Sequence, residues 1–208
     1  MTSALALDPK KIDVLDRGPW MQTHLGRVFF PGDPRPEDIF IEDIAYPLAM
    51  MCRYGGHTTR WRHVSIAEHS SIVAQYVFDH HESYYGLKGA AAAALCGLLH
   101  DAAEAYCGDM IASVKALLPE FKTRVEHPIQ EAVWLRFGVR PTPDVAAFIK
   151  MADCRIPRNE RDAAMTKSPH PWNCDRTPPL PFEFQCLPPE RAHAEFMGLF
   201  NRWAREIA

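Results

Sequence analysis

Apolar side chains recur every three or four residues along most of this chain, which is the spacing of one face of an α-helix. The pattern contains no repeated βα unit, and we expect at most a short strand at Phe29-Phe30 or at the preceding Arg27-Val28. We therefore predict an all-α fold. Its helices are expected over about residues 44–53, a stretch after Ser65, 88–106, 119–137, a stretch after Thr142, and 189–207.

Residues that favour helix ends support several of these boundaries. Ser65 and Glu68 form the S-x-x-E pattern of a capping box before an apolar stretch. Thr142-Pro143 places a cap residue before proline at the first helical position. Pro128 lies inside an expected helix and should kink it or divide it in two, because proline lacks the backbone N–H.

Two segments are expected to be irregular. Prolines interrupt residues 1–35, and a second proline-rich segment covers residues 167–189. The second segment contains Trp172, Phe182 and Phe184, which favour burial, so we expect an ordered loop rather than a linker. The predicted organisation is a single domain over residues 1–208, with a core at about 25–165, the loop 167–189 and a C-terminal helix 189–207.

Composition narrows the classes of function. A formal net charge of −3 gives no basic excess for binding duplex nucleic acid. The N-terminus lacks a basic segment followed by a long apolar run, and no uncharged apolar stretch reaches membrane-spanning length, so we expect no signal peptide and no membrane helix. The six cysteines include no C-x-x-C pair, which favours free thiols and a cytoplasmic protein; Cys96 and Cys154 are interpreted as small buried packing residues.

The dipeptide His100-Asp101 is the most informative chemical feature of the chain. Both side chains can bind a divalent metal, and two more candidate ligands, His69 and Asp153, lie in other expected helices. Two imidazoles and two carboxylates suit one divalent cation such as Mn, Co, Zn, Mg or Ni, with positions left for water and substrate. The sequence therefore predicts a metal site built from four residues.

Two of these residues have an ordinary structural alternative. His69 shares a helix face with Val73, and taken alone it reads as a buried core histidine. Asp153 lies among apolar residues, where a carboxylate is costly to bury unless it is paired or ligated. A salt bridge with Arg155 or Arg158 is the alternative to ligation.

Further carboxylates follow the dipeptide. Glu104 lies four residues after His100, on the same side of an expected helix, and Asp109 follows shortly after. Both are candidates for handling protons in catalysis. The run RNERD at residues 158–162 is interpreted as a salt-bridged helix face, although its Glu160 lies two turns after the last candidate ligand on the same side.

The order of these residues resembles the pattern H…HD…D of the HD-domain metal-dependent phosphohydrolases. The stretches HVSIAEHSSIVA, LLHDAAEAYCGDMIASVKALLP and FIKMAD, within about residues 25–165, are similar to bacterial and prophage proteins related to the YfbR-type 5'-deoxynucleotidases. The resemblance implies a helical bundle with one metal in its core and attack of a metal-bound water on a phosphate ester. It implies that the ligands are His69, His100, Asp101 and Asp153, and that Glu104 and Asp109 move protons or orient the water.

The resemblance also implies that an arginine well before the first ligand holds the phosphate, and Arg53 is the nearest match. The nucleotidase pattern has tryptophan after that arginine, where this chain has Tyr54, so the pattern does not predict which base is bound. His57, Lys115 and Lys150 are further candidates to meet the negative charge of a phosphate. For each of these cations, a solvent-exposed surface charge is the alternative.

The leading expectation is hydrolysis of a nucleoside 5'-monophosphate, in particular a deoxynucleotide, and the second is removal of triphosphate from a deoxynucleoside triphosphate. A two-iron oxygenase of the same fold needs extra histidines before the last aspartate, where His127 alone stands. A non-catalytic binding module is disfavoured because all six ligand and acid positions are occupied. The aromatic stripe of residues 189–207 suits the core or a subunit contact in a homodimer.

Overall fold

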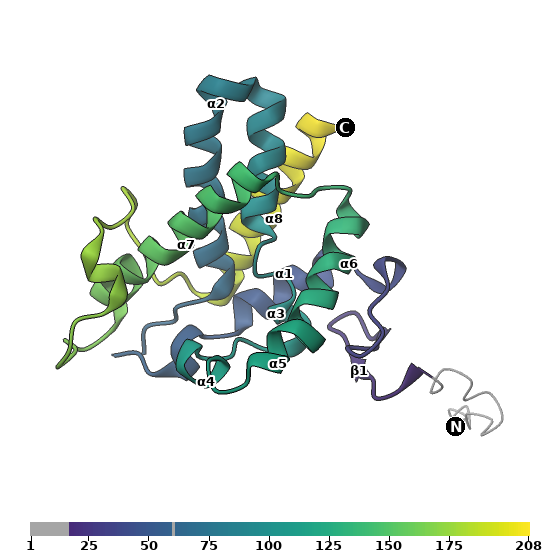
Figure 1. The fold of residues 1–208 in the computed structure, drawn as a ribbon, viewed down its shortest axis with the longest axis horizontal. Helices are drawn as coiled ribbons and strands as arrows, with labels where there is room; N and C mark the ends of the chain where they lie inside the picture. Colours follow the sequence, from purple (N-terminus) through teal and green to yellow (C-terminus); the bar gives the residue numbers. More distant parts are fainter. Residues whose placement is uncertain (1–16, 60) are drawn as a thin grey trace, which may run out of the picture.

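The computed structural model describes residues 17–59 and 61–208 and is mostly helical, which confirms the all-α prediction (Figure 1). Residues 1–16 of the segment expected to be irregular lie outside the described residues. No helix in the described ranges combines the length and apolarity needed to cross a membrane. The elements are β1 (Met21–Gln22), β2 (Val28–Phe29), η2 (Pro36–Asp38), α1 (Ile41–Met50), η3 (Arg53–Gly56), α2 (Ile66–Leu98), α3 (Glu104–Cys107), α4 (Ala112–Lys115), α5 (Pro119–Phe121), η4 (Lys122–Glu126), α6 (His127–Phe137), α7 (Pro143–Ala164), η5 (Asn173–Arg176) and α8 (Pro189–Ile207).

Helix α2 is folded into two antiparallel arms that form the middle of the bundle (Figure 1). The arms join at Gly86, whose φ of 65° and ψ of 179° are open to glycine but not to other residues. They pack closely, because a Cβ atom added at Gly97 would lie 3.1 Å from the Cα atom of Ala74. The beginning of the first arm therefore lies beside the end of the second arm.

The C-terminal helix α8 packs against α2 and α1, and α7 packs against α2 (Figure 1). Phe196 and Trp203 on α8 have no exposed surface, and the Trp203 ring stacks on Phe78 of α2 with 5.7 Å between ring centroids. The aromatic stripe predicted for residues 189–207 thus lies in the core, and the predicted bounds of this helix are confirmed.

A short β-hairpin precedes the bundle. Strands β1 and β2 are antiparallel, with Met21 opposite Phe29, which confirms the short strand expected in this region. Phe29 is fully buried and stacks on Tyr106 with 4.1 Å between ring centroids. The hairpin is thereby fixed to α3.

The N-terminus of α2 is held in two ways. The Ser65 hydroxyl accepts a hydrogen bond from the N–H of Glu68 at 3.1 Å, as the capping pattern predicts. The Glu68 carboxylate does not complete a capping box. It accepts instead from the N–H groups of Gln185 and Leu187, at 2.7 and 2.8 Å. The segment that leads into α8 is therefore joined to the turn of α2 that carries His69.

The first predicted helix is shifted along the chain. We expected it over about residues 44–53, but α1 begins at Ile41 and ends at Met50. The N–H of Arg53 donates to the carbonyl oxygen of Val64 at 2.8 Å, and Cys52 pairs with Ser65 in an isolated β-bridge. These long-range bonds hold the chain extended where a helix was expected.

The helix predicted over residues 88–106 is interrupted in the structure. The second arm of α2 ends at Leu98, and α3 begins at Glu104. Between them the chain makes tighter turns, in which the N–H of Ala102 donates to the Leu99 carbonyl oxygen at 3.1 Å. His100 and Asp101 therefore lie in a turn, although the alanine-rich sequence favours helix.

Pro128 disturbs its helix as predicted. The five residues Lys122–Glu126 before α6 adopt a π-helical turn, in which the N–H of His127 bonds to the carbonyl oxygen of Lys122. The wider turn makes room for the proline ring, which would otherwise press on the carbonyl group of the preceding turn.

The proline-rich segment is packed against α7, as expected for an ordered loop. The side-chain amide of Asn159 donates to the carbonyl oxygens of Leu180 and Phe182, at 2.9 and 2.7 Å, and accepts from the N–H of Leu180. Leu180 and Phe184 are buried. This loop therefore covers the half of α7 that follows Asp153.

Candidate metal centre

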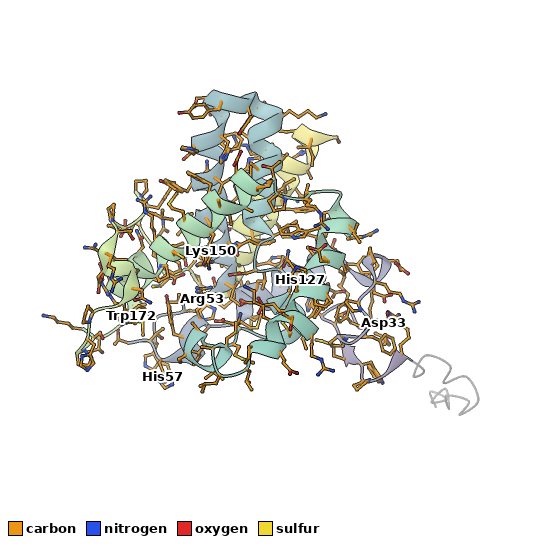
Figure 2. The ribbon with its side chains drawn as sticks, in the orientation of Figure 1. Asp33, Arg53, His57, His127, Lys150 and Trp172 are labelled. Carbon is orange, nitrogen blue, oxygen red and sulfur yellow. The ribbon has the colours of Figure 1, made fainter. Side chains whose placement is uncertain are left out.

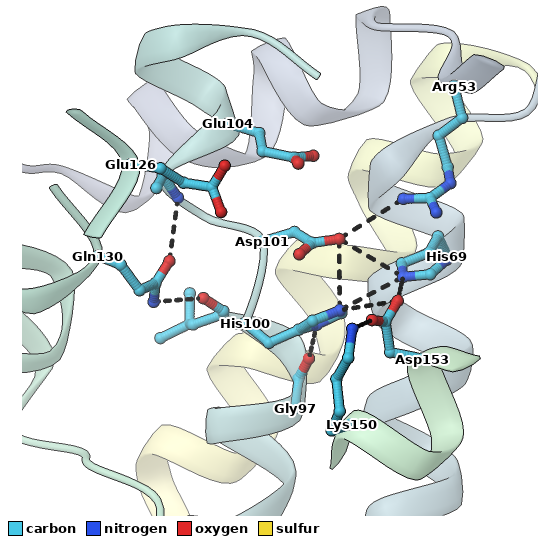
Figure 3. A network of polar contacts seen from close by, with 12 residues as sticks. Arg53, His69, Gly97, His100, Asp101, Glu104, Glu126, Gln130, Lys150 and Asp153 are labelled. Atoms are coloured by element: carbon cyan, nitrogen blue, oxygen red, sulfur yellow. Dashed lines mark hydrogen bonds and ion pairs between the residues drawn. The ribbon is translucent and has the colours of Figure 1, made fainter. Parts of the chain in front are cut away.

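The four candidate ligands meet at one point in the structure (Figure 3). His69 lies in the first turn of α2, Asp153 lies in the middle of α7, and His100 and Asp101 lie in the turn after α2. One nitrogen or oxygen atom of each residue lies within 4.8 Å of those of the other three. The cluster thus joins the two ends of the α2 hairpin to α7.

Hydrogen bonds to the Nδ1 atoms direct both histidine rings. Nδ1 of His100 lies 2.7 Å from the carbonyl oxygen of Gly97, and because a carbonyl can only accept, Nδ1 carries the proton. Nδ1 of His69 lies 2.7 Å from a carboxylate oxygen of Glu160, which fixes the same tautomer. Both rings therefore turn Nε2 towards the centre of the cluster.

The spacing of the four atoms suits one metal ion. The two Nε2 atoms are 3.3 Å apart, and Nε2 of His69 lies 3.5 Å from Asp101 and 3.4 Å from Asp153. Ligands about 2.1 Å from a divalent ion are separated by about 3.0–3.4 Å when they adjoin each other around it. Two nitrogens and two carboxylate oxygens form a donor set that such ions accept. The residues present therefore fit a divalent cation.

The four side chains also create an environment that favours a positive charge at the centre of the cluster. Burial opposes ionisation of Asp153, but hydrogen bonds and charge from His100 and His69 outweigh it and lower the pKa of this carboxyl group. Burial opposes protonation of His100, yet Asp101 and Asp153 raise its pKa to about 9. Since a proton and a metal ion compete for the same lone pairs, binding of a metal ion by this cluster would depend on pH.

Glu160 is a functional candidate that the sequence interpretation placed wrongly. We expected it on a salt-bridged surface of α7, but it has no exposed surface. Its carboxylate accepts from Nδ1 of His69 and from the hydroxyl of Tyr54, and Nε of Arg53 lies 3.2 Å away. Burial opposes its ionisation, but the charge of Arg53 and the neighbouring donors lower its pKa to about 2. The signal in the sequence was its position two turns after Asp153.

Glu104 lies beside Asp101 without joining the ligand cluster (Figure 3). Burial and the negative charges of Asp101 and Asp109 raise its pKa to about 9. One of its oxygens lies 3.4 Å from Nζ of Lys115, and the other has no hydrogen-bond partner among the described residues. Burial also raises the pKa of Asp109, which is close enough to Arg53 for that charge to oppose the shift. Both predicted acids therefore adjoin the cluster, and the pKa of each is raised.

Three of the four predicted cations lie beside the acidic groups of the site. Arg53 is largely buried, and its guanidinium lies 3.5 Å from Asp101 as well as beside Glu160. Nζ of Lys150 lies 2.8 Å from Asp153 while most of its side chain is exposed. Lys115 pairs with Glu126 at 2.6 Å in addition to Glu104. Each of these cations is thus matched to at least one carboxylate.

His57 is not brought into the cluster. It is exposed, and Figure 2 shows it at the edge of the molecule, away from Arg53. In the described part of the chain it makes no hydrogen bond or ion pair with a ligand residue. The surface alternative therefore describes it better than a place beside the metal ligands.

The structure also decides several alternatives. Arg155 does not pair with Asp153; it donates to the hydroxyl of Tyr76 and to backbone carbonyls of the proline-rich loop. His127 is exposed on α6 and lies 3.9 Å from Glu131, so it does not adjoin the cluster.

Of the two cysteines next to candidate ligands in the sequence, Cys96 is buried as expected, whereas Cys154 on α7 is exposed, so the expectation of a buried packing residue is wrong for Cys154.

Comparison with known proteins agrees with this fold and cluster. Residues 51–134 match the HD domain family. The chain is 30% identical over 184 residues to the uncharacterised protein YfdR of Escherichia coli K12, an alignment that covers 88% of this chain and 94% of that protein. It is 39% identical over 146 residues to an uncharacterised protein of Rhodobacter capsulatus, covering 69% of this chain and 71% of that protein.

The helical bundle and its His/Asp cluster define a protein of the metal-binding HD type, and the chain belongs to the HD-domain family. Domains of this family bind divalent metals and are in general metal-dependent phosphohydrolases. The matched residues include Arg53, His69 and the dipeptide His100-Asp101, and they end before Asp153. The fourth member of the cluster is thus supplied by the structure outside the matched segment.

Proposed function

We propose that this protein hydrolyses a nucleoside 5'-monophosphate, in particular a deoxynucleotide, to the nucleoside and inorganic phosphate. The observation that carries the proposal is the convergence of two imidazole nitrogens and two carboxylate oxygens beside a carboxyl group, Glu104, that is not one of them. The similarity of the motif stretches to the YfbR-type 5'-deoxynucleotidases favours the deoxynucleotide.

His69, His100, Asp101 and Asp153 would hold the metal ion. A divalent cation, when bound, lowers the pKa of a coordinated water and polarises a phosphoryl oxygen. The protein fixes the geometry for this chemistry through Gly97 and Glu160, which orient the two imidazole rings.

Glu104 is the first candidate to move a proton. Its pKa of about 9 is set by burial and by Asp101 and Asp109, so added positive charge at the cluster lowers it towards neutrality. A carboxyl group with a pKa near the working pH can take a proton from water and return it to the leaving oxygen. Asp109, whose pKa is also raised, is the second candidate.

The balance of charge favours a monophosphate over a triphosphate. Among the described residues, three cations lie at the site, and each is already paired with carboxyl groups: Arg53 with Asp101 and Glu160, Lys115 with Glu104 and Glu126, and Lys150 with Asp153. A triphosphate carries about twice the negative charge of a monophosphate, and would need cations that are not matched in this way. Arg53, close to Asp101, is the best placed of them to contact one phosphate group.

The test is a nucleotide panel with identified products. Purified protein is incubated with Mn²⁺ or Co²⁺ and with deoxynucleoside and ribonucleoside mono- and triphosphates. We expect inorganic phosphate and nucleoside in equal amounts from monophosphates, and loss of this activity in Asp153→Asn. Asp144→Asn, an exposed aspartate on the same helix, is the matched control and should keep the activity. Release of triphosphate, or no turnover of any nucleotide, would contradict the proposal.

A further inference from the structure

A side chain from α6 is inserted into the helix break that carries the metal-ligand dipeptide. In a continuous α-helix, the N–H of Ala103 would donate to the carbonyl oxygen of Leu99. In the structure, the side-chain amide of Gln130 lies between these two groups. Its Nε2 donates to the Leu99 carbonyl oxygen at 2.9 Å, and its Oε1 accepts from the N–H of Ala103 at 3.2 Å (Figure 3).

Both backbone groups need these bonds, because Leu99 and Ala103 are buried. The Leu99 carbonyl oxygen also accepts from the N–H of Ala102, at 3.1 Å. The N–H of Ala103 has no other acceptor in the part of the chain that the structure describes. Gln130 therefore bridges the Leu99 carbonyl oxygen and the Ala103 N–H, a pair that a continuous helix would join directly.

The break matters because a regular helix could not direct both members of the dipeptide to one ion. Consecutive residues on an α-helix point about 100° apart and do not face each other. In the interrupted segment, Nε2 of His100 and a carboxylate oxygen of Asp101 lie 3.3 Å apart. The two side chains can therefore be adjacent ligands only while the turn stays open.

The geometry points to Gln130 as a positioning residue of the metal centre, one that holds the turn of residues 99–103 open and so aims His100 and Asp101 at the same point. The inference rests on the metal site of the proposed function. An amide side chain supplies a donor and an acceptor on one planar group, in the way a peptide group does. Glutamate would set a second acceptor against the Leu99 carbonyl oxygen, and methionine would leave the Ala103 N–H without a partner.

The test compares wild type with Gln130→Glu, Gln130→Met and the shorter amide Gln130→Asn. Gln75→Met is the matched control, because Gln75 lies on α2 and, among the described residues, its side-chain amide donates a hydrogen bond to Asp79 and to no other residue. Metal-free samples whose helical circular dichroism matches that of wild type are titrated with Co²⁺. The titration gives the Co²⁺ affinity and the visible spectrum of the Co²⁺ protein. Hydrogen exchange of the Ala103 amide is measured on the same samples without metal.

We expect Gln130→Met to bind Co²⁺ about 10–100-fold more weakly with a changed spectrum, as is typical when a residue that orients ligands is lost. Gln130→Glu should bind Co²⁺ more weakly than Gln130→Met, and the Co²⁺ affinity of Gln130→Asn should lie between those of wild type and Gln130→Met. Hydrogen exchange of the Ala103 amide should be faster than in wild type in all three variants. Folded variants with wild-type affinity, spectrum and Ala103 exchange would overturn the role of Gln130. Wild-type protein that binds no Co²⁺ would overturn the metal centre itself, and this role with it. If Gln130→Glu and Gln130→Met fail to fold, Gln130→Asn decides by the same three readouts.

Discussion

Replacing Glu160 by glutamine would remove a negative charge from the most enclosed part of the site while keeping the size of the side chain. The carboxylate has no exposed surface and accepts from Nδ1 of His69 at 2.7 Å. Glutamine can keep this acceptor through its own Oε1. The principal loss is therefore the charge that faces Arg53 and the imidazole ring.

Two physical arguments give the size of the effect. Burial opposes ionisation of Glu160, but Arg53 and His69 lower its pKa from 4.5 to about 2, which corresponds to about 3 kcal/mol of stabilisation. Removing one member of a buried charge pair costs about 3–5 kcal/mol. Arg53 keeps Asp101 at 3.5 Å, so the lower value applies. We expect Glu160→Gln to lower the free energy of unfolding by about 3 kcal/mol at pH 7.

The sign of the pH dependence is fixed by the lowered pKa. The carboxylate contributes its stabilisation above the unfolded-state pKa of 4.5, and this contribution is lost as the pH falls towards about 2. The difference between wild type and Glu160→Gln should therefore shrink below pH 4.5. His69 also loses a charged partner for Nδ1, so metal affinity should fall about 10–100-fold.

Urea unfolding in EDTA and calorimetric titration with Mn²⁺ measure these two effects separately. Tyr54→Phe is the control, because it removes one hydrogen bond to Glu160 without changing its charge. That variant should lose about 1 kcal/mol and keep nearly wild-type affinity. A Glu160→Gln protein that loses less than about 1 kcal/mol and binds Mn²⁺ as wild type does would refute the reasoning.

Three further predictions concern the centre. Because Asp101 and Asp153 raise the pKa of His100 to about 9 against the opposing effect of burial, its proton stabilises the metal-free protein below pH 6.5 and this effect is lost as the pH rises through about 9. Apparent metal affinity should accordingly rise about tenfold per pH unit between these limits, and calorimetry in different buffers should detect about one released proton; a pH-independent affinity would contradict this. Glu104→Gln should keep the metal content measured by atomic spectroscopy but lower kcat by about 10²–10⁴-fold, whereas unchanged kcat would exclude it from proton transfer. Arg53→Met should raise KM for the nucleotide in steady-state assays, and an unchanged KM would show that Arg53 does not contact phosphate.

The residues that the sequence predicted well are those whose pattern is local. The helix over residues 189–207 follows from apolar spacing alone, and its buried Trp203 and Phe196 confirm the pattern. The four ligand candidates were recognised because their types and order suit a divalent cation, and the structure brings them within 4.8 Å of one another.

The features that the sequence did not predict depend on residues far apart in the chain. Local alanine propensity favoured a helix through residue 106, whereas its break after Leu98 is matched by the amide of Gln130 on another helix. Glu160 stands in a run of charged residues that is typical of a surface. In the structure its carboxylate contacts Tyr54 and Arg53, and these two residues directly follow Cys52, which forms a β-bridge with Ser65.

The central claim is that His69, His100, Asp101 and Asp153 together hold one divalent ion. The most direct measurement is the metal content of purified protein after loading with Mn²⁺ or Co²⁺ and removal of free metal, for wild type and Asp101→Ala. The account predicts about one ion per chain in wild type and almost none in Asp101→Ala. Two ions per chain in wild type, or an unchanged metal content in Asp101→Ala, would contradict it.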